Sequence, residues 1–206
     1  VQYHFCNESL RDSFYSGSWE YQNCEKHSIF MSQAATPIKG LHFMLRAMPE
    51  ILKNYPDAHL YVAGNDLTKT DSIYGKLKIS SFAKYIKRLI TEYGLEEKVT
   101  FTGSLTEHQM KERFLKSNVF VSPSTIENSP NSLGEAMLLG VPCVSSDVGG
   151  VKNLMKHEEE GYVYQTDAPY MLAYYIKKIF SINNQVEIIG SNAKKHAIRT
   201  HSREDN

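Results

Sequence analysis

Short apolar runs alternate with longer segments of helical periodicity along the chain. Runs of apolar and β-branched residues bounded by turn residues predict strands over residues 28–33, 58–63, 98–102, 118–122, 141–145 and 161–164. Between them, apolar residues recur every three or four positions and predict helices over residues 39–55, 82–93, 106–116, 131–139, 169–181 and 184–200. Pro56 is expected to end the first helix and Gly94 to cap the second, and a polar loop is expected from residue 64 to about residue 80.

This alternation of strands and helices predicts the fold class. Short strands joined by helices form a parallel sheet with right-handed crossovers, so the chain is expected to be a doubly wound, Rossmann-like α/β domain. Ligands bind such sheets at the carboxyl ends of the strands. A functional site is therefore expected in the loops that follow residues 33, 63, 102, 122 and 145.

The first 27 residues differ from the rest because they lack clear periodicity. They carry several aromatic side chains, namely Phe5, Phe14, Tyr15, Trp19 and Tyr21, which are expected to pack on other parts of the protein. Residues 1–27 are interpreted as a linker or the remnant of an upstream domain. Residues 28–206 are expected to form the ligand-binding domain together with its C-terminal helices.

Composition and charge exclude several classes of protein. The 206 residues include 23 Lys and Arg and 23 Asp and Glu, and this zero balance argues against a dedicated nucleic-acid binder. Three cysteines are too few for a disulfide framework and suit a reducing compartment. No apolar run reaches the roughly 18 residues that span a bilayer, and the start of the chain does not resemble a signal peptide. Because it also lacks an initiator Met, the chain is expected to be part of a longer protein.

Lys39, after the first predicted strand, is the first candidate for a binding residue. A cation at a helix N-terminus does not stabilise the helix, but it attracts an anion such as a pyrophosphate. The alternative is a solvated surface lysine. Neither a glycine-rich dinucleotide-binding fingerprint nor a P-loop motif occurs, which argues against nicotinamide dehydrogenases and P-loop proteins.

A stronger candidate follows the fourth strand, where two carboxylates flank a helix start. Ser129 and Pro130 fit an N-cap followed by the first helical residue, which would leave the backbone N–H groups of residues 131 and 132 free to hold a phosphate or a sugar hydroxyl. Glu127 and Glu135 are expected to face the sheet crevice, where a carboxylate can accept two hydrogen bonds from a sugar diol. The alternative for Glu135 is a partly buried carboxylate that caps neighbouring amides.

A glycine pair and the scattered histidines and cysteines are weaker candidates for function. Gly149 and Gly150 allow close backbone approach to a ligand, and a tight turn is at least as good an explanation. The histidines and cysteines show no metal-ligand spacing, so no metal site is expected.

Taken in order, these motifs resemble the C-terminal, donor-binding half of a GT-B glycosyltransferase of the retaining family-4 type. The resemblance covers about residues 28–180, and its marks are Lys39-Gly40, Phe101-Thr102-Gly103, Pro123-Ser124, the pair Glu127 and Glu135, and the segment from Gly140 to Gly150. It implies a hexosyltransferase-type enzyme of polysaccharide or glycan biosynthesis that binds a nucleotide-diphospho-sugar. It also implies that the acceptor, a glycan or lipid, is held by an N-terminal domain absent from this chain. A cytoplasmic location follows, with any membrane contact made through that domain.

The resemblance also assigns roles to residues. Glu127 is implied to be catalytic at the donor sugar and Glu135 to bind the ribose, with Lys39 on the diphosphate and the amides of Asn131 and Ser132 on sugar or phosphate. Gly103, Ser104 or Leu105 would lie near the base. No Asp-x-Asp motif occurs, in agreement with a metal-independent reaction without a cofactor.

The chain departs from the family pattern at two places. Gln33-Ala34 stands where a Gly-Arg pair is common, so Lys39 or a cation from elsewhere is expected to balance the diphosphate charge. Pro130 has no N–H to donate, so amide contacts are expected from its neighbours. Two other functions stay open: a nucleotide-sugar epimerase, and a non-catalytic module that binds sugar nucleotides.

Overall fold

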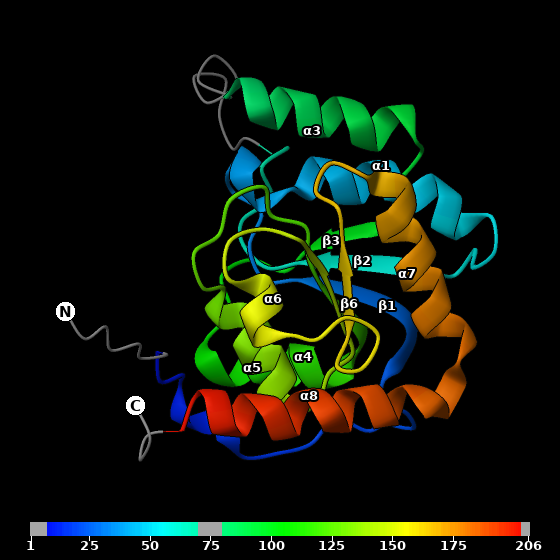
Figure 1. The fold of residues 1–206 in the computed structure, drawn as a ribbon. Helices are drawn as coiled ribbons and strands as arrows, with labels where there is room; N and C mark the ends of the chain where they lie inside the picture. The colour runs from blue at the N-terminus through cyan, green and yellow to red at the C-terminus, as the bar shows by residue number, and fades with distance from the viewer. Residues whose placement is uncertain (1–7, 70–79, 203–206) are drawn as a thin grey trace.

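One parallel sheet organises the protein, and the computed structural model describes residues 8–69 and 80–202 of it (Figure 1). Its strands are β1 (Glu25–Met31), β2 (His59–Val62), β3 (Val99–Phe101), β4 (Ser117–Ser122), β5 (Cys143–Ser146) and β6 (Tyr162–Tyr164), in the order β3-β2-β1-β4-β5-β6. All six predicted strands are therefore confirmed, within three residues at each end. Phe5 and most of the polar loop predicted up to about residue 80 lie outside the described residues.

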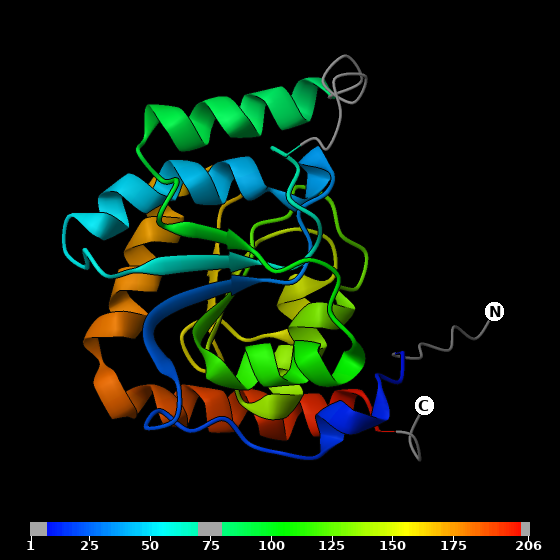
Figure 2. The ribbon, with the colours of Figure 1, turned by 180° about the vertical axis from the view of Figure 1, so that it is seen from behind.

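Helices cover both faces of this sheet, as predicted for a doubly wound fold (Figures 1 and 2). The longer ones are α1 (Leu41–Leu52), α3 (Ser81–Glu92), α4 (Glu107–Lys116), α5 (Asn131–Leu139), α7 (Pro169–Ser181) and α8 (Val186–Thr200). On one side α1 packs against α3 and α7, and on the other α5 packs against α4 and α8. The fold class is confirmed.

The short helical segments show where the predictions were incomplete. These segments are the 3-10 helices η1 (Asp12–Tyr15), η2 (Pro37–Lys39) and η3 (Asn183–Gln185) and the helix α6 (Val151–Leu154). The helix predicted over residues 39–55 is shorter at both ends. It starts at Leu41, because Gly40 adopts a left-handed φ of 76° between η2 and α1, and it ends at Leu52 with Lys53 as its C-cap, so Pro56 is not the residue that ends it. Gly94 caps the end of α3 as predicted, with a φ of 62°.

The strand order places a topological switch point between β1 and β4. From β1 the chain winds outward through β2 and β3, then returns to β4 and winds the other way through β5 and β6. The two crossovers leave the carboxyl ends of β1 and β4 in opposite directions, which opens a crevice between the loops that follow them. Ligands of doubly wound domains bind in this crevice.

The N-terminal segment, residues 8–24, is packed onto the domain, which confirms the expectation for its aromatic residues. Phe14 and Trp19 are buried, and the Trp19 indole N–H donates to the carbonyl of Ser117 at 2.7 Å. His201, at the end of α8, donates through Nδ1 to the carbonyl of Glu8 at 2.7 Å, and the Tyr15 hydroxyl donates to the His201 carbonyl at 2.6 Å. The segment is thereby fixed between α5 and the end of α8.

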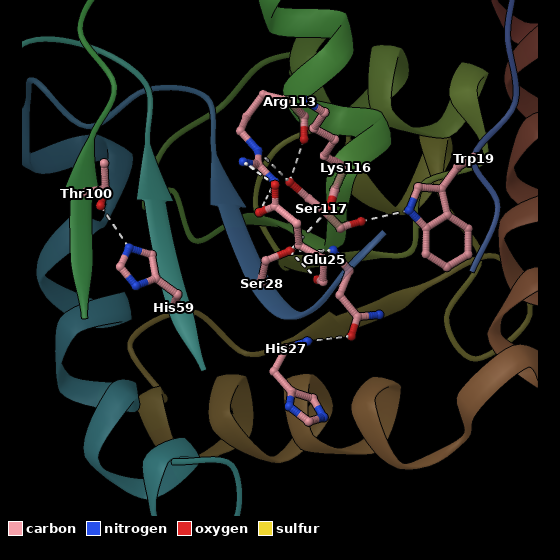
Figure 3. A network of polar contacts seen from close by, with 10 residues as sticks. Trp19, Glu25, His27, Ser28, His59, Thr100, Arg113, Lys116 and Ser117 are labelled. Carbon is pink, nitrogen blue, oxygen red and sulfur yellow. Dashed lines mark hydrogen bonds and ion pairs between the residues drawn. The ribbon is translucent and has the colours of Figure 1, made fainter. Parts of the chain in front are cut away.

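A polar network at the amino end of the sheet fixes the start of β1 against β4 (Figure 3). The β1–β4 register shifts between Glu25 and Ile29, and the hydroxyl of Ser28 satisfies the backbone at this irregularity. It donates to the Glu25 carbonyl at 2.6 Å and accepts from the buried N–H of Asn118 at 3.0 Å. The network lies at the opposite end of the sheet from the crevice, and its partners are mainly backbone groups, so its role is structural.

Replacing Ser28 with Ala is expected to lower the free energy of unfolding by about 1–3 kcal/mol, because the buried N–H of Asn118 loses its acceptor. Urea unfolding of the parent and the variant measures this. Ser191, exposed on α8, provides the control, and Ser191→Ala should change stability by less than about 0.5 kcal/mol. Equal stabilities of Ser28→Ala and the parent protein would contradict the structural role of the network.

Candidate functional site

The loop after β1 and the loop after β4 are tied together through Gly40. A Cβ atom added to this glycine would lie 1.8 Å from the carbonyl oxygen of Pro123, so only glycine permits the approach. Beside it, the N–H of Thr125 donates to the carbonyl of Ile38 at 2.8 Å. The two loops of the switch point are therefore held at fixed positions, and Lys39 is placed directly beside the β4 loop.

Lys39 and Glu127 form an ion pair across these two loops. The ammonium nitrogen of Lys39 lies 2.6 Å from Oε1 of Glu127, and the hydroxyl of Ser124 donates to the same oxygen at 2.8 Å. Both side chains are mostly buried, with 26% and 13% of their surfaces exposed. The alternative of a solvated surface lysine at position 39 is therefore wrong.

The start of α5 lies next to this pair, at the predicted residue but with a different N-cap. Pro130, rather than Ser129, is the N-cap, and the helix begins at Asn131. The Pro130 carbonyl accepts from the N–H of Leu133 at 2.9 Å, which starts the helical ladder. The N–H groups of Asn131 and Ser132 precede that first bond, and within the described residues they have no backbone acceptor.

Gly149 and Gly150 approach the loop that carries Glu127. Gly149 has a left-handed φ of 51°, and an added Cβ would lie 1.7 Å from the carbonyl oxygen of Glu127. The N–H of Gly150 donates to the carbonyl of Asn128 at 2.9 Å. The glycine pair therefore forms a tight turn, which was the alternative to close approach to a ligand. The backbone that it approaches belongs to the loop of Glu127 and Asn128.

Glu135, on the second turn of α5, pairs with Arg11 from the N-terminal segment. The guanidinium of Arg11 donates through Nε and Nη2 to the two carboxylate oxygens, at 2.6 and 2.7 Å. The Glu135 side chain is 7% exposed and that of Arg11 is 41% exposed. These hydrogen bonds raise the pKa of Arg11 above its ordinary value. The alternative of Glu135 as a cap for neighbouring amides finds no support among the described residues.

These groups line one cavity of about 590 Å³ at the carboxyl ends of β1 and β4. Its lining includes Lys39, Glu127, Asn131, Ser132 and Glu135, together with Glu8, Ser9, Leu10, Arg11, Ser32, Gln33, Met110, Ser129 and Pro130. A smaller hollow beside it reaches the ends of the two strands and is lined by Lys39, Glu127 and Ser132, among others. The structure thus brings together five of the eight predicted site residues, at the predicted edge of the sheet.

The remaining three predicted residues, Gly103, Ser104 and Leu105, lie outside the lining of this cavity. Gly103 instead forms an isolated bridge with Gly64, through two backbone hydrogen bonds of 2.9 and 3.1 Å. Arg11, conversely, lines the cavity and was not predicted. It lies 124 residues before its partner in a segment without periodicity, so no local pattern in the sequence could indicate it.

Membrane-spanning helices and metal-binding clusters are absent from residues 8–69 and 80–202. In these ranges no helix is long and apolar enough to span a bilayer, and no three His, Cys, Asp or Glu side chains cluster closely enough to hold a metal ion.

The fold and the cavity together define a class of protein. The chain belongs to the glycosyl transferases group 1 family, whose model matches residues 21–196. Among curated proteins, the uncharacterized glycosyltransferase MJ1607 of Methanocaldococcus jannaschii is 30% identical to it over 181 residues, which are 88% of the chain and 42% of MJ1607. The chain thus spans less than half the length of this relative.

Solved structures with the same fold include HepE from Anabaena in complex with UDP-glucose. It has a TM-score of 0.72 and 22% identity, and the match covers 86% of the chain and 45% of HepE. The C-terminal domain of LpcC, a group 1 family protein from Francisella tularensis, gives a TM-score of 0.71 at 18% identity, with 95% of the chain and 94% of that domain covered. These likenesses show a Rossmann-like domain of the kind found in GT-B glycosyltransferases.

Proposed function

We propose that the chain is the donor-binding domain of a retaining glycosyltransferase, with a nucleotide-diphospho-sugar as its ligand. One observation carries the proposal: a single cavity at the switch point holds a lysine, two carboxylates and the free amides of a helix start. Each of these groups suits one part of such a donor. Lys39 and the amides of Asn131 and Ser132 suit the diphosphate, Glu135 the ribose diol, and Glu127 the sugar.

The spacing of these groups matches the covalent order of the donor. In a nucleotide-diphospho-sugar the sugar is bonded directly to the diphosphate, so their binding groups have to be neighbours. Lys39 and Glu127 are in contact at 2.6 Å, and both border the smaller hollow at the strand ends. Glu135 lines only the larger cavity, on the side of the N-terminal segment. The donor is therefore oriented with its sugar toward the strand ends and its nucleoside toward that segment.

The same groups support the chemistry of transfer. As the bond between the sugar and the diphosphate breaks, negative charge accumulates on the leaving diphosphate. Lys39 and the positive end of α5 stabilise that charge, which requires no metal ion and no cofactor. Glu127, held by Lys39 and Ser124, faces the sugar and is the catalytic residue of the proposal.

The relatives support the wider role of the protein. HepE was crystallised with UDP-glucose, and the LpcC domain of similar extent is the C-terminal domain of its protein. We infer that an N-terminal domain binds the glycan or lipid acceptor and completes the cleft. Transfer of a hexose on the cytoplasmic side of a membrane, in polysaccharide or glycan synthesis, is the corresponding activity.

A panel of UDP-, GDP- and ADP-sugars tests the donor proposal. At least one of them should raise the melting temperature of the chain, in proportion to saturation. Lys39→Ala should weaken binding of the corresponding nucleoside diphosphate by about tenfold or more, because a charge-assisted contact is lost, while the affinity for the nucleoside stays the same. Lys84→Ala, on α3, is the control and should leave both affinities unchanged. Absence of binding across the whole panel would contradict the proposal.

A further inference from the structure

The carboxylate assigned to the ribose already has a partner within the protein. Both oxygens of Glu135 accept hydrogen bonds from Arg11, in the bidentate geometry that makes arginine–carboxylate pairs strong. A ribose diol needs the same oxygens as acceptors. If Glu135 binds ribose, as the proposed function states, the ligand therefore has to displace Arg11 from at least part of the carboxylate.

The backbone around Arg11 is fixed, although its side chain is partly exposed. Leu10 and Phe14 are buried on either side of it, and the N–H of Phe14 donates to the Arg11 carbonyl at 3.1 Å. The close packing depends on Gly134 in α5, where an added Cβ would lie 2.8 Å from Leu10 and 2.7 Å from His201. Displacement from Glu135 would therefore move the guanidinium and leave the segment in place at the cavity.

The charges in the cavity make this displacement specific for one kind of ligand. Its lining contains two cations, Lys39 and Arg11, and three carboxylates, those of Glu8, Glu127 and Glu135, and each cation is engaged by a carboxylate. A nucleoside that displaced Arg11 would remove the carboxylate that the guanidinium contacts and would bring no anion in exchange. A nucleoside diphosphate brings its own anion into the same cavity. A guanidinium can form bidentate hydrogen bonds with phosphate oxygens, as it does with a carboxylate.

We propose that Arg11 determines specificity by exchanging partners: it pairs with Glu135, as in the structure, and moves to the diphosphate when the ribose diol takes Glu135. Binding of the diol and of the diphosphate is thereby coupled through one side chain. The domain should therefore bind the nucleoside diphosphate more tightly than the nucleoside, and the difference in affinity should be larger than the charge of Lys39 alone would produce. The inference rests on the proposed donor function and adds to it a residue from outside the two loops of the switch point.

The test compares matched ligand pairs on the 206-residue chain by titration calorimetry, namely UDP with uridine, GDP with guanosine, and ADP with adenosine. In Arg11→Ala, Glu135 is free, so the nucleoside should bind at least as tightly as to the parent protein. The diphosphate loses a bidentate cation, so its affinity should fall about tenfold or more. The preference for diphosphate over nucleoside therefore drops by at least that factor. Arg11→Gln, which keeps hydrogen bonding without charge, should show the same drop.

Arg113→Ala is the matched control, because Arg113 forms the same kind of pair with Glu25 at the opposite end of the sheet, at 2.8 Å (Figure 3). It should leave the preference unchanged. Equal losses for both ligands in Arg11→Ala would mean a merely structural role and overturn the inference, as would an unchanged preference. If neither the parent nor the variant binds any ligand, the donor proposal itself fails. Diphosphate binding that appears only after Arg11 is removed would show that Arg11 merely occludes Glu135, and it would also overturn the exchange.

Discussion

Replacing Gly149 with Ala is expected to disrupt the site, although residue 149 is not among the residues that line the cavity. The new Cβ would lie 1.7 Å from the carbonyl oxygen of Glu127, and the φ of 51° is one that alanine adopts only with strain. Either the turn or the Glu127 loop has to move. The free energy of unfolding should fall by about 2–5 kcal/mol, and nucleoside diphosphate affinity should fall at least about tenfold as Lys39 and Glu127 separate.

Gly94→Ala is the control that separates the effect of backbone strain from the effect of a steric clash. Gly94 has a similar φ of 62°, but among the residues that the structure describes, none apart from its chain neighbours has an atom within 4 Å of the position of its Cβ. This variant should lose only about 1–2 kcal/mol of stability, from the left-handed conformation alone, and keep full affinity for the ligand. Urea unfolding and calorimetry on both variants make the comparison. Identical behaviour of the two variants would show that Gly149 does not position the Glu127 loop.

Replacing Glu135 with Ala is expected to have the second large effect. A diol held by a carboxylate makes charge-assisted hydrogen bonds worth about 1.5–3 kcal/mol each, so nucleoside and nucleoside diphosphate affinities should both fall by about tenfold or more. Arg11 also loses its partner and becomes free to face the diphosphate. The nucleoside should therefore lose more affinity than the diphosphate does.

Glu25→Ala provides the control for this change. It removes a carboxylate from a bidentate arginine pair at the other end of the sheet and should leave both affinities as they are in the parent protein. Calorimetry with UDP, GDP and ADP and their nucleosides measures the effect. Unchanged nucleoside affinity in Glu135→Ala would refute the ribose assignment.

Much of the fold could be predicted because its signals are local. Apolar runs marked each strand, and the helix from Asn131 to Leu139 was predicted with its observed ends, since a leucine-rich segment is bounded there by Pro130 and Gly140. Helix α6 was missed because four residues are too few to show a helical period. The start of α1 was misplaced because the left-handed turn at Gly40 is set by contact with Pro123, which is distant in the sequence.

The site residues that could be predicted are those in the segments directly after the strands. Lys39, Glu127 and Glu135 all come from loops or helix starts after β1 and β4, and the parallel topology brings them together. Arg11 could not be predicted, because its position depends on packing between the N-terminal segment, α5 and His201. The prediction that Gly103, Ser104 or Leu105 lies near the base rested on family resemblance alone and stays a prediction.

Amide chemical shifts of the isotopically labelled chain test the central claim most directly. During titration with UDP, GDP or ADP, the amides of Asn131 and Ser132 are expected to shift progressively toward saturation, because they are the free donors at the cavity. The amides of Ser28 and Asn118, at the opposite end of the sheet, should stay in place. Unmoved amides at 131 and 132 at saturating ligand, with shifts gathered instead around Tyr170 and Tyr174 in the groove between α1 and α7, would contradict the account.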